Sequence, residues 1–347
     1  MLHSRLRPLP RRHQPQHPSS TAPPPDLHDE DDADVDEPED LFTAFLPHLF
    51  PDDAPSFHGD PGQRLLYSSP RYGDLEIMVP SYPGQSEKRT EEIAAGQEGR
   101  NEVDEGRKLF AHFLWSAAMV VAEGVEWDDD DGDADTGVDN NINREREHKG
   151  MWRVKGERVL ELGAGAALPS LISALAHASS VTITDHPSSP AFAGAIDYNI
   201  AANIPADLRS RISAEPHEWG VLDTPWAVEN KGRFTRIIAA DCLWMRSQHE
   251  NLVKTFLWFL PPVSEDGDGE GRVWIVAGFH TGRAIVAGFF ETAVQMGMVI
   301  ERIYERDLNS GGDDGREARR EWTPVREGEG PENRKRWCVI AVLKRGR

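Results

Sequence analysis

The segment Val159–Pro169, with the sequence V-L-E-L-G-A-G-A-A-L-P, constrains the fold of this chain more than any other. An apolar run that ends in two closely spaced glycines, Gly163 and Gly165, is typical of a buried strand followed by a tight turn. Pro169 favours the start of a helix directly after that turn. Glycine at both positions lets the backbone approach a ligand closely, because side chains there would block the approach. A tight turn without a ligand is the alternative interpretation.

Strand and helix patterns alternate after residue 150, which is typical of a mainly parallel sheet covered on both faces. The last two strand patterns are separated only by a polar loop at 309–331, so we expect them to form an antiparallel hairpin. The predicted fold class is a doubly wound α/β domain with a seven-stranded, mostly parallel sheet. Strands are expected at 158–162, 181–184, near 212, 236–240, 273–277, 299–304 and 337–343, with helices near 169–176, 191–202, 250–260 and 282–296.

Four regions are expected along the chain. Residues 1–40 are predicted to be a disordered tail, and 41–126 an N-terminal extension with a β-hairpin at 65–80 and a helix at 109–121 that includes Trp115. Residues 127–150 are predicted to be an acidic, disordered insertion, because so many carboxylates cannot bury enough apolar surface. Residues 151–347 are predicted to form the main domain.

The net charge of −21 over 347 residues comes mostly from two acidic blocks, 26–40 and 128–139. A chain this negative argues against binding to nucleic acid, whose phosphates it would repel, and remains compatible with a basic protein partner. The two cysteines, Cys242 and Cys338, lie in apolar runs and suit a reducing compartment. We therefore expect a cytoplasmic monomer without a membrane span.

Asp185 ends the strand that follows the glycine turn and lies 20 residues beyond Gly165. In doubly wound nucleotide-binding folds, an acid at this place accepts hydrogen bonds from the two ribose hydroxyls. The alternative is a helix N-cap or turn role, because Pro187 and Ser188 follow.

The ligand predicted from the residues is S-adenosyl-L-methionine. A dinucleotide fingerprint requires a third small residue where this chain has Leu168, and its pyrophosphate requires an open helix N-terminus. No lysine and Ser/Thr pair follows the glycines, which argues against a nucleoside triphosphate.

Further candidates follow from the switch-point rule, by which the ends of the strands border the ligand crevice. Trp219, in the H-E-W-G segment, offers a flat surface to an adenine ring, and Trp115 is a candidate lid residue. Core packing is the alternative for both tryptophans. At the end of the fourth strand, Ala240 leaves room for the ligand, while Asp241 and Trp244 are expected to face the acceptor. A helix N-cap is the alternative for Asp241. The histidine spacing predicts no metal site.

Together, these motifs and the upstream L-W-S-A-A segment resemble the seven-β-strand protein-lysine methyltransferases, most closely the fungal branch of elongation factor methyltransferase 7, once described as nicotinamide N-methyltransferase-like. The resemblance covers roughly residues 41–345, apart from the acidic insertion. It implies cofactor contacts at Trp115, Gly163, Ala164, Gly165, Asp185, Trp219 and Ala240, and a basic protein substrate such as a translation factor. Ala167 stands where the family has a glycine, and its methyl group is expected to be tolerated in the first turn of the helix.

Three functions are compatible with this sequence. The first is methylation of a protein, on lysine or on the N-terminus, with Asp241 and Trp244 as the candidate catalytic residues. The second is methylation of a small nicotinamide-like molecule or amine. The third is a non-catalytic scaffold that binds a nucleotide.

Overall fold

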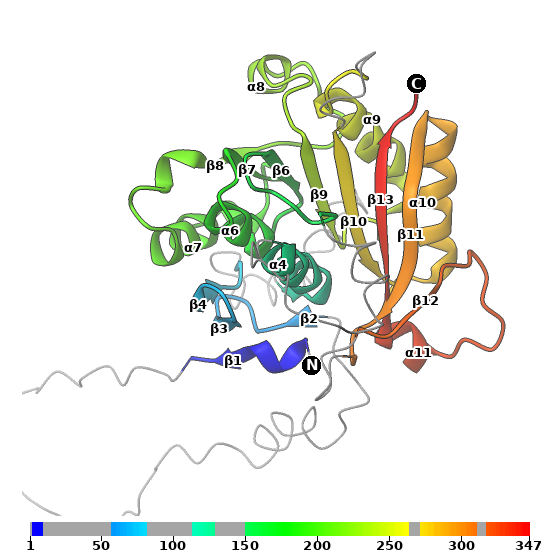
Figure 1. The fold of residues 1–347 in the computed structure, drawn as a ribbon, viewed down its shortest axis with the longest axis horizontal. Coiled ribbons are helices and arrows are strands. Elements are labelled where there is room, and N and C mark those ends of the chain that lie inside the picture. Colours follow the sequence, from blue (N-terminus) through cyan, green and yellow to red (C-terminus); the bar gives the residue numbers. More distant parts are fainter. Residues whose placement is uncertain (1, 10–56, 82–112, 129–149, 264–270, 311–316) are drawn as a thin grey trace, which may run out of the picture.

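The computed structural model describes residues 2–9, 57–81, 113–128, 150–263, 271–310 and 317–347. Its largest element is an eight-stranded sheet with the order β12-β11-β13-β10-β9-β6-β7-β8 (Figure 1). The strands are β6 (Arg158–Leu162), β7 (Ser180–Asp185), β8 (Ile212–Pro216), β9 (Arg236–Ala240), β10 (Arg272–Gly278), β11 (Met298–Asp307), β12 (Arg319–Glu321) and β13 (Trp337–Arg345). The predicted doubly wound α/β class is confirmed, and the short strand β12 adds an eighth strand to the predicted seven.

The sheet is parallel from β8 through β7, β6 and β9 to β10. Strand β13 lies between β10 and β11 and runs antiparallel to both, so the last two long strands form the predicted antiparallel pair. Strand β12 comes from the loop between them and pairs with the outer side of β11. Because parallel strands end at the same edge, the residues that follow β6, β7, β9 and β10 are brought together there.

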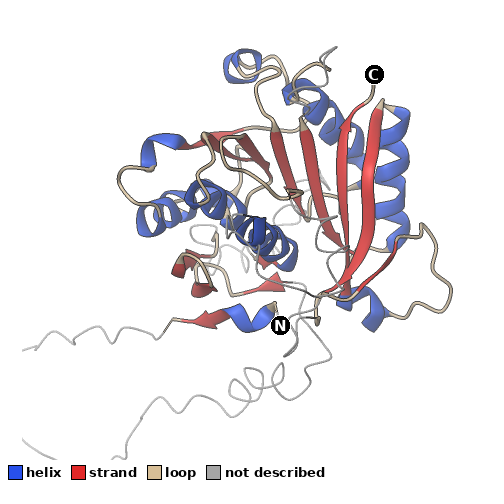
Figure 2. Ribbon diagram, viewed as in Figure 1, coloured by secondary structure: helices blue, strands red, loops and turns tan. Residues whose placement is uncertain are grey.

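Helices cover both faces of the sheet (Figure 2). One face packs against α4 (Ser116–Asp128), α6 (Leu168–Leu175) and α7 (Ala195–Asn203), and the other against α9 (His249–Phe259) and α10 (Arg283–Gln295). Successive side chains of a strand point to opposite faces, so in β9 Ile238 belongs to the first core and Ile237 to the second. The helices α8 (Pro225–Glu229) and α11 (Pro331–Arg336) were not predicted, because they are too short to show a helical period.

The predicted N-terminal hairpin is present as β3 (Arg64–Ser69) and β4 (Gly73–Met78). Two asparagines of α7 hold it against the main domain. The backbone N–H of Met78 donates to Asn199 Oδ1 at 2.7 Å, and that of Glu76 donates to Asn203 Oδ1 at 2.8 Å. The Asn199 amide also donates to the carbonyl of Ala166, in the turn after β6, at 2.9 Å. The extension is thereby tied directly to the glycine turn.

The prediction of a disordered tail is wrong for residues 2–9. They form a 3-10 turn (His3–Arg5) and strand β1 (Leu6–Pro8), which pairs antiparallel with β3. Leu2 is 3% exposed, and the Arg5 guanidinium contacts both Glu123 and Glu126 of α4. The segment is polar and its partners in β3 and α4 lie 57 to 121 residues away in the sequence, so its own sequence does not show the strand. The remainder of the predicted tail, residues 10–40, lies outside the described residues.

The upstream helix begins later than predicted. Leu114 and Trp115 form strand β5, which pairs with β2 (Phe57–His58), and the helix α4 starts only at Ser116. Trp115 is therefore on a strand that leads into the helix. Most of the acidic insertion lies outside the described residues, but its two borders are adjacent, because Asp128 Oδ1 accepts the N–H of Gly150 at 2.8 Å.

Among the described residues, no helix has the length and apolar character needed to cross a membrane.

We predict that Arg5→Gln lowers the free energy of unfolding by about 1–3 kcal/mol, because Glu126 then remains as a buried carboxylate without its cation. Glu126 is 1% exposed, and burial raises its pKa. The loss should narrow as the pH is lowered and Glu126 takes up a proton. Urea unfolding at several pH values measures both effects.

The matched control is Arg7→Gln, because Arg7 makes an ion pair with Asp74 in which both side chains are about half exposed. Exposed pairs contribute less than about 1 kcal/mol. Equal losses in the two variants would contradict a specific role for Arg5.

Candidate active site

A crevice opens where β6, β7 and β9 end. Its empty volume, open mouth included, is about 770 Å³. Of the residues predicted from the sequence, all but Ala164 line the crevice: Trp115, Gly163, Gly165, Asp185, Trp219, Ala240, Asp241 and Trp244. Ala164 is buried between the two glycines, where its N–H donates to the Thr184 carbonyl at 3.0 Å.

The floor of the crevice requires glycine. Gly163 has φ +66, and a Cβ atom on it would lie 3.1 Å from Cys242 Sγ and 3.2 Å from the Trp219 ring. These contacts are tighter than side chains normally make, so any other residue would press on both walls. Gly165 has φ +52, also in the left-handed region that favours glycine. The backbone is therefore bare where the sequence predicted close approach to a ligand.

Asp185 faces this glycine turn. Its Oδ2 accepts the N–H of Gly165 at 2.8 Å, and its Oδ1 accepts the N–H of His186 at 2.7 Å. Burial raises the pKa of Asp185, while these two N–H donors act in the opposite direction. Asp185 is not a helix cap, because Ser189 accepts the N–H of Ala191 at the start of the following 3-10 helix.

Glu161 lies in strand β6, which leads into the glycine turn, and was not predicted as a site residue. It accepts hydrogen bonds from the backbone N–H and the hydroxyl of Ser170, in the first turn of α6. That helix has no side-chain N-cap of its own, so Glu161 takes this part from the neighbouring strand. Burial raises the pKa of Glu161 to about 8. A glutamate in an apolar strand is visible in the sequence, but its hydrogen bonds with Ser170 are not, because only the fold brings the two residues together.

Ala167 departs from the expectation stated above. It lies at the N-cap, one residue before α6 begins, and has φ +59. This left-handed conformation costs a residue with a side chain more than it costs glycine. The prediction that Ala167 lies in the first turn of the helix is therefore wrong. Ala167 is fully buried, but it precedes the helix.

The wall beyond β8 is aromatic. Trp219 lines the crevice there together with His217, a residue that the sequence analysis did not assign to the site. His217 is 3% exposed and packs against Trp226 and Phe259, with ring centroids 5.3 and 5.2 Å away. Burial lowers the pKa of His217 to about 4, so its imidazole is neutral at physiological pH.

Asp241 follows β9 and has φ +54, unusual for a residue other than glycine. Its Oδ1 accepts the N–H of Gly278 at 2.8 Å, and its carboxylate also accepts the N–H of Ala117 in the first turn of α4. Burial raises the pKa of Asp241, opposed by His280 and by these N–H donors. The helix-cap interpretation thus applies to Asp241, but for the distant helix α4. Trp244 lines the crevice on the same side.

Comparison with known proteins identifies the family. A family profile described as "Lysine methyltransferase" matches residues 100–262. A Gibberella zeae protein named "Protein N-terminal and lysine N-methyltransferase EFM7" is 30% identical over 211 residues, which cover 57% of this chain and 70% of the relative. The protein of the same name from Candida glabrata is 32% identical over 199 residues, which cover 56% of this chain and 66% of the relative.

The chain belongs to this lysine methyltransferase family. Membership makes it an S-adenosyl-L-methionine-dependent methyltransferase. Among solved structures, a methyltransferase complexed with SAH aligns over 89% of this chain and 66% of its own, with 10% identity and a TM-score of 0.46.

The crevice fits the donor of this methyltransferase family. The described residues that line it include the carboxylates of Asp185 and Asp241 but no lysine or arginine. Such a lining suits a ligand with a ribose and a positive charge and gives no counter-charge to a phosphate. No group of three or more metal-ligating side chains occurs among the described residues.

We predict that Glu161→Gln removes a pH dependence of stability. The carboxyl pKa of Glu161 is about 8 in the folded protein against an ordinary 4.5, so the folded state retains a proton that the unfolded chain has released. The free energy of unfolding of the parent protein should therefore fall as the pH rises through this window, by up to about 1.4 kcal/mol per pH unit, relative to the variant. Urea unfolding across the window measures it. Parallel pH profiles would contradict a buried, protonated Glu161.

Proposed function

We propose that this methyltransferase acts on a protein amine, either a lysine side chain or an N-terminal α-amino group. The observation that carries the proposal is the shared crevice, with Asp185 at the glycine turn and Asp241 and Trp244 at the end of β9. Fungal relatives at 30–32% identity are named for methylation of protein N-termini and lysines. An acidic crevice is also suited to an amine acceptor.

The proposed donor site comprises the residues predicted for it. Asp185 binds the ribose hydroxyls through carboxylate oxygens that retain lone pairs beside the Gly165 and His186 N–H groups. The backbone of Gly163, Ala164 and Gly165 lets the donor approach, and Trp219 contacts the adenine. Trp115 and Ala240 border the methionine part. When bound, S-adenosyl-L-methionine supplies an activated methyl group on its sulfonium.

The acceptor side must present a neutral amine in line with that methyl group. A lysine has an ordinary pKa of about 10.4, so it must lose a proton before it can attack. Trp244 and the buried Met245 lower the pKa of the amine by removing it from water. Asp241 orients the amine by accepting a hydrogen bond from it. Most of the protein's contribution is alignment of the two reactants.

The finer parts of the proposal concern the partner and its setting. We propose a basic protein substrate, a translation factor among the candidates, and a monomeric enzyme in the cytoplasm. Cys242 and Cys338 are both free thiols and buried, which suits a reducing compartment. Methylation of a small nicotinamide-like amine is the second candidate.

Labelling separates these functions. The protein is incubated with radiolabelled S-adenosyl-L-methionine and a fungal lysate, and protein is then separated from small molecules. We expect label in a protein band, and mass spectrometry of that band then assigns lysine or N-terminal methylation. Label only in the low-mass fraction would support the small-amine function, and no label above the enzyme-free control would contradict both.

Site variants test the assignment of the two carboxylates. Asp185→Ala should weaken the binding of S-adenosylhomocysteine about 10- to 100-fold, because one charged hydrogen-bond acceptor contributes about 1.5–3 kcal/mol. Asp241→Asn should change this affinity by less than about threefold but slow turnover. Calorimetry and the labelling assay measure the two effects.

The matched control is Asp223→Ala, because Asp223 is exposed and lies outside the crevice. Thermal melting checks that each variant is folded. Unchanged affinity for S-adenosylhomocysteine in folded Asp185→Ala would refute the ribose assignment.

A further inference from the structure

Trp115 is held from behind by an imidazole. The ring of His280, two residues after β10, stacks on the indole with centroids 4.8 Å apart and an angle of 25° between the planes. Phe113 meets the same indole edge-on at 6.1 Å. Trp115 and Phe113 line the crevice, whereas His280 lines a separate small cavity behind it. The imidazole therefore supports the crevice wall without forming part of the lining.

The same imidazole faces the carboxylate of Asp241. Its Nδ1 lies 3.9 Å from Asp241 Oδ1, within the range of an ion pair when the ring is protonated. Asp241 lines both the crevice and the small cavity, so it stands between them. A Cβ atom on Gly278 would lie 3.0 Å from His280 Nδ1, so a larger residue there would press on the ring.

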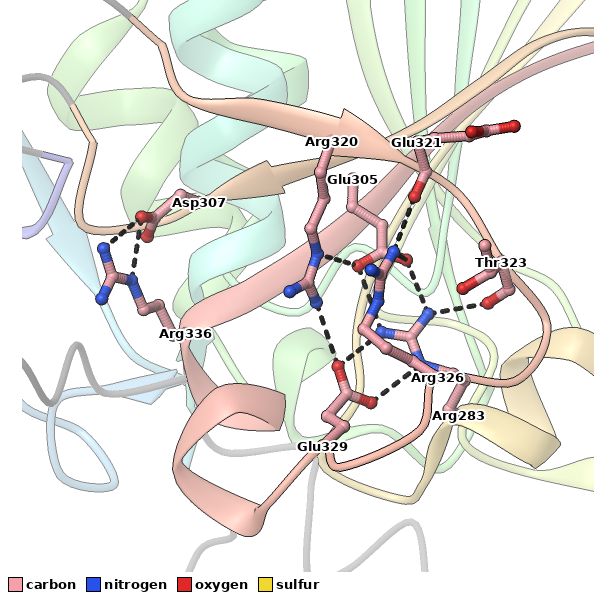
Figure 3. A network of polar contacts seen from close by, with 9 residues as sticks. All are labelled: Arg283, Glu305, Asp307, Arg320, Glu321, Thr323, Arg326, Glu329 and Arg336. Atoms are coloured by element: carbon pink, nitrogen blue, oxygen red, sulfur yellow. Dashed lines mark hydrogen bonds and ion pairs between the residues drawn. The ribbon is translucent and has the colours of Figure 1, made fainter.

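The segment that carries His280 is anchored by a buried charge network (Figure 3). Arg283, 7% exposed, donates to Glu305 at 2.6 Å and to Glu329 at 2.6 Å. Arg320 joins the same two carboxylates from strand β12. Arg283 also lies 4.1 Å above the ring of Phe279, which stacks on Trp322 at 5.9 Å.

Gly278, Phe279 and Arg283 thus fix the backbone on both sides of His280. Breaking a network of this kind by removing one member leaves a buried charge without its partner, so the network resists rearrangement. A histidine on this loop has one ring face on Trp115 and its Nδ1 within ion-pair range of Asp241, so it lies next to both sides of the crevice.

We propose that His280 is a positioning residue with two separable effects. Through its ring face it holds Trp115 as a wall of the donor site, and through Nδ1 it holds the Asp241 carboxylate on the acceptor side. The proposal rests on the proposed methyltransfer function of this crevice. It predicts that donor affinity and turnover depend on different parts of one side chain.

Two substitutions separate the effects. His280→Phe keeps an aromatic face for Trp115 and removes the nitrogen, whereas His280→Asn keeps a nitrogen near the position of Nδ1 and removes the stacked ring. For His280→Asn, the dissociation constant of S-adenosylhomocysteine should rise about 2- to 10-fold, the usual range for an aromatic pair, with turnover at saturating donor nearly unchanged. For His280→Phe, affinity should stay within about twofold while turnover falls.

A third readout does not depend on the function. The fluorescence of Trp115, taken as the difference between each protein and the same protein carrying Trp115→Phe, should change in His280→Asn and be largely kept in His280→Phe. His177→Asn is the control, because His177 is exposed and asparagine tolerates its left-handed backbone. Thermal melting confirms folding.

The outcomes are distinct. The proposal is supported if His280→Asn weakens donor binding and changes the fluorescence of Trp115, while His280→Phe slows turnover and leaves donor binding and fluorescence largely unchanged. Equal losses of both parameters in both variants, or no change in either, overturn it. If the parent protein binds no S-adenosylhomocysteine, the proposed function fails. In that case, a fluorescence change confined to His280→Asn still supports the contact with Trp115, and its absence overturns it.

Discussion

The hydrogen bond from the Gly165 N–H to the Asp185 carboxylate is the interaction on which the site depends. It joins the ends of two neighbouring parallel strands, and it places a carboxylate above a turn that carries no side chain at Gly163 or Gly165. The glycine turn also depends on Glu161, which fixes the start of α6 through its hydrogen bonds with Ser170. A bare backbone, a facing carboxylate and a fixed helix start are the physical requirements for a bound nucleoside in this fold.

The opposite side of the crevice depends on a second carboxylate, that of Asp241. It accepts N–H groups from Gly278 and Ala117 and so connects β9, β10 and the start of α4. Helix α4 is held at its other end by Arg5 from the N-terminal 3-10 turn. Trp115, directly before α4, is therefore placed by elements from three distant parts of the chain. This is why a wall of the crevice can be both preformed and exposed to a ligand.

Local patterns predicted the parts of the fold that are governed by local physics. The two glycines, the acid 20 residues later and the alternation of apolar strands and amphipathic helices indicated the doubly wound sheet, its antiparallel end and the crevice. Predictions failed where contacts between residues far apart in the sequence determine the local structure. Arg5 belongs to a polar segment that becomes a strand only because α4 and β3 supply its partners. Trp115 was assigned to a helix, since pairing with β2 is invisible in its own sequence. The sequence around His217, Glu161 and His280 has no distinctive pattern, and only the fold brings these residues to the site.

The measurement that tests this account most directly is a crystal structure of the protein with bound S-adenosylhomocysteine. We expect both ribose hydroxyls within hydrogen-bonding distance of the Asp185 carboxylate and the adenine ring against Trp219. Ligand density away from the Gly163–Gly165 turn, or a ribose that does not contact Asp185, would contradict the account.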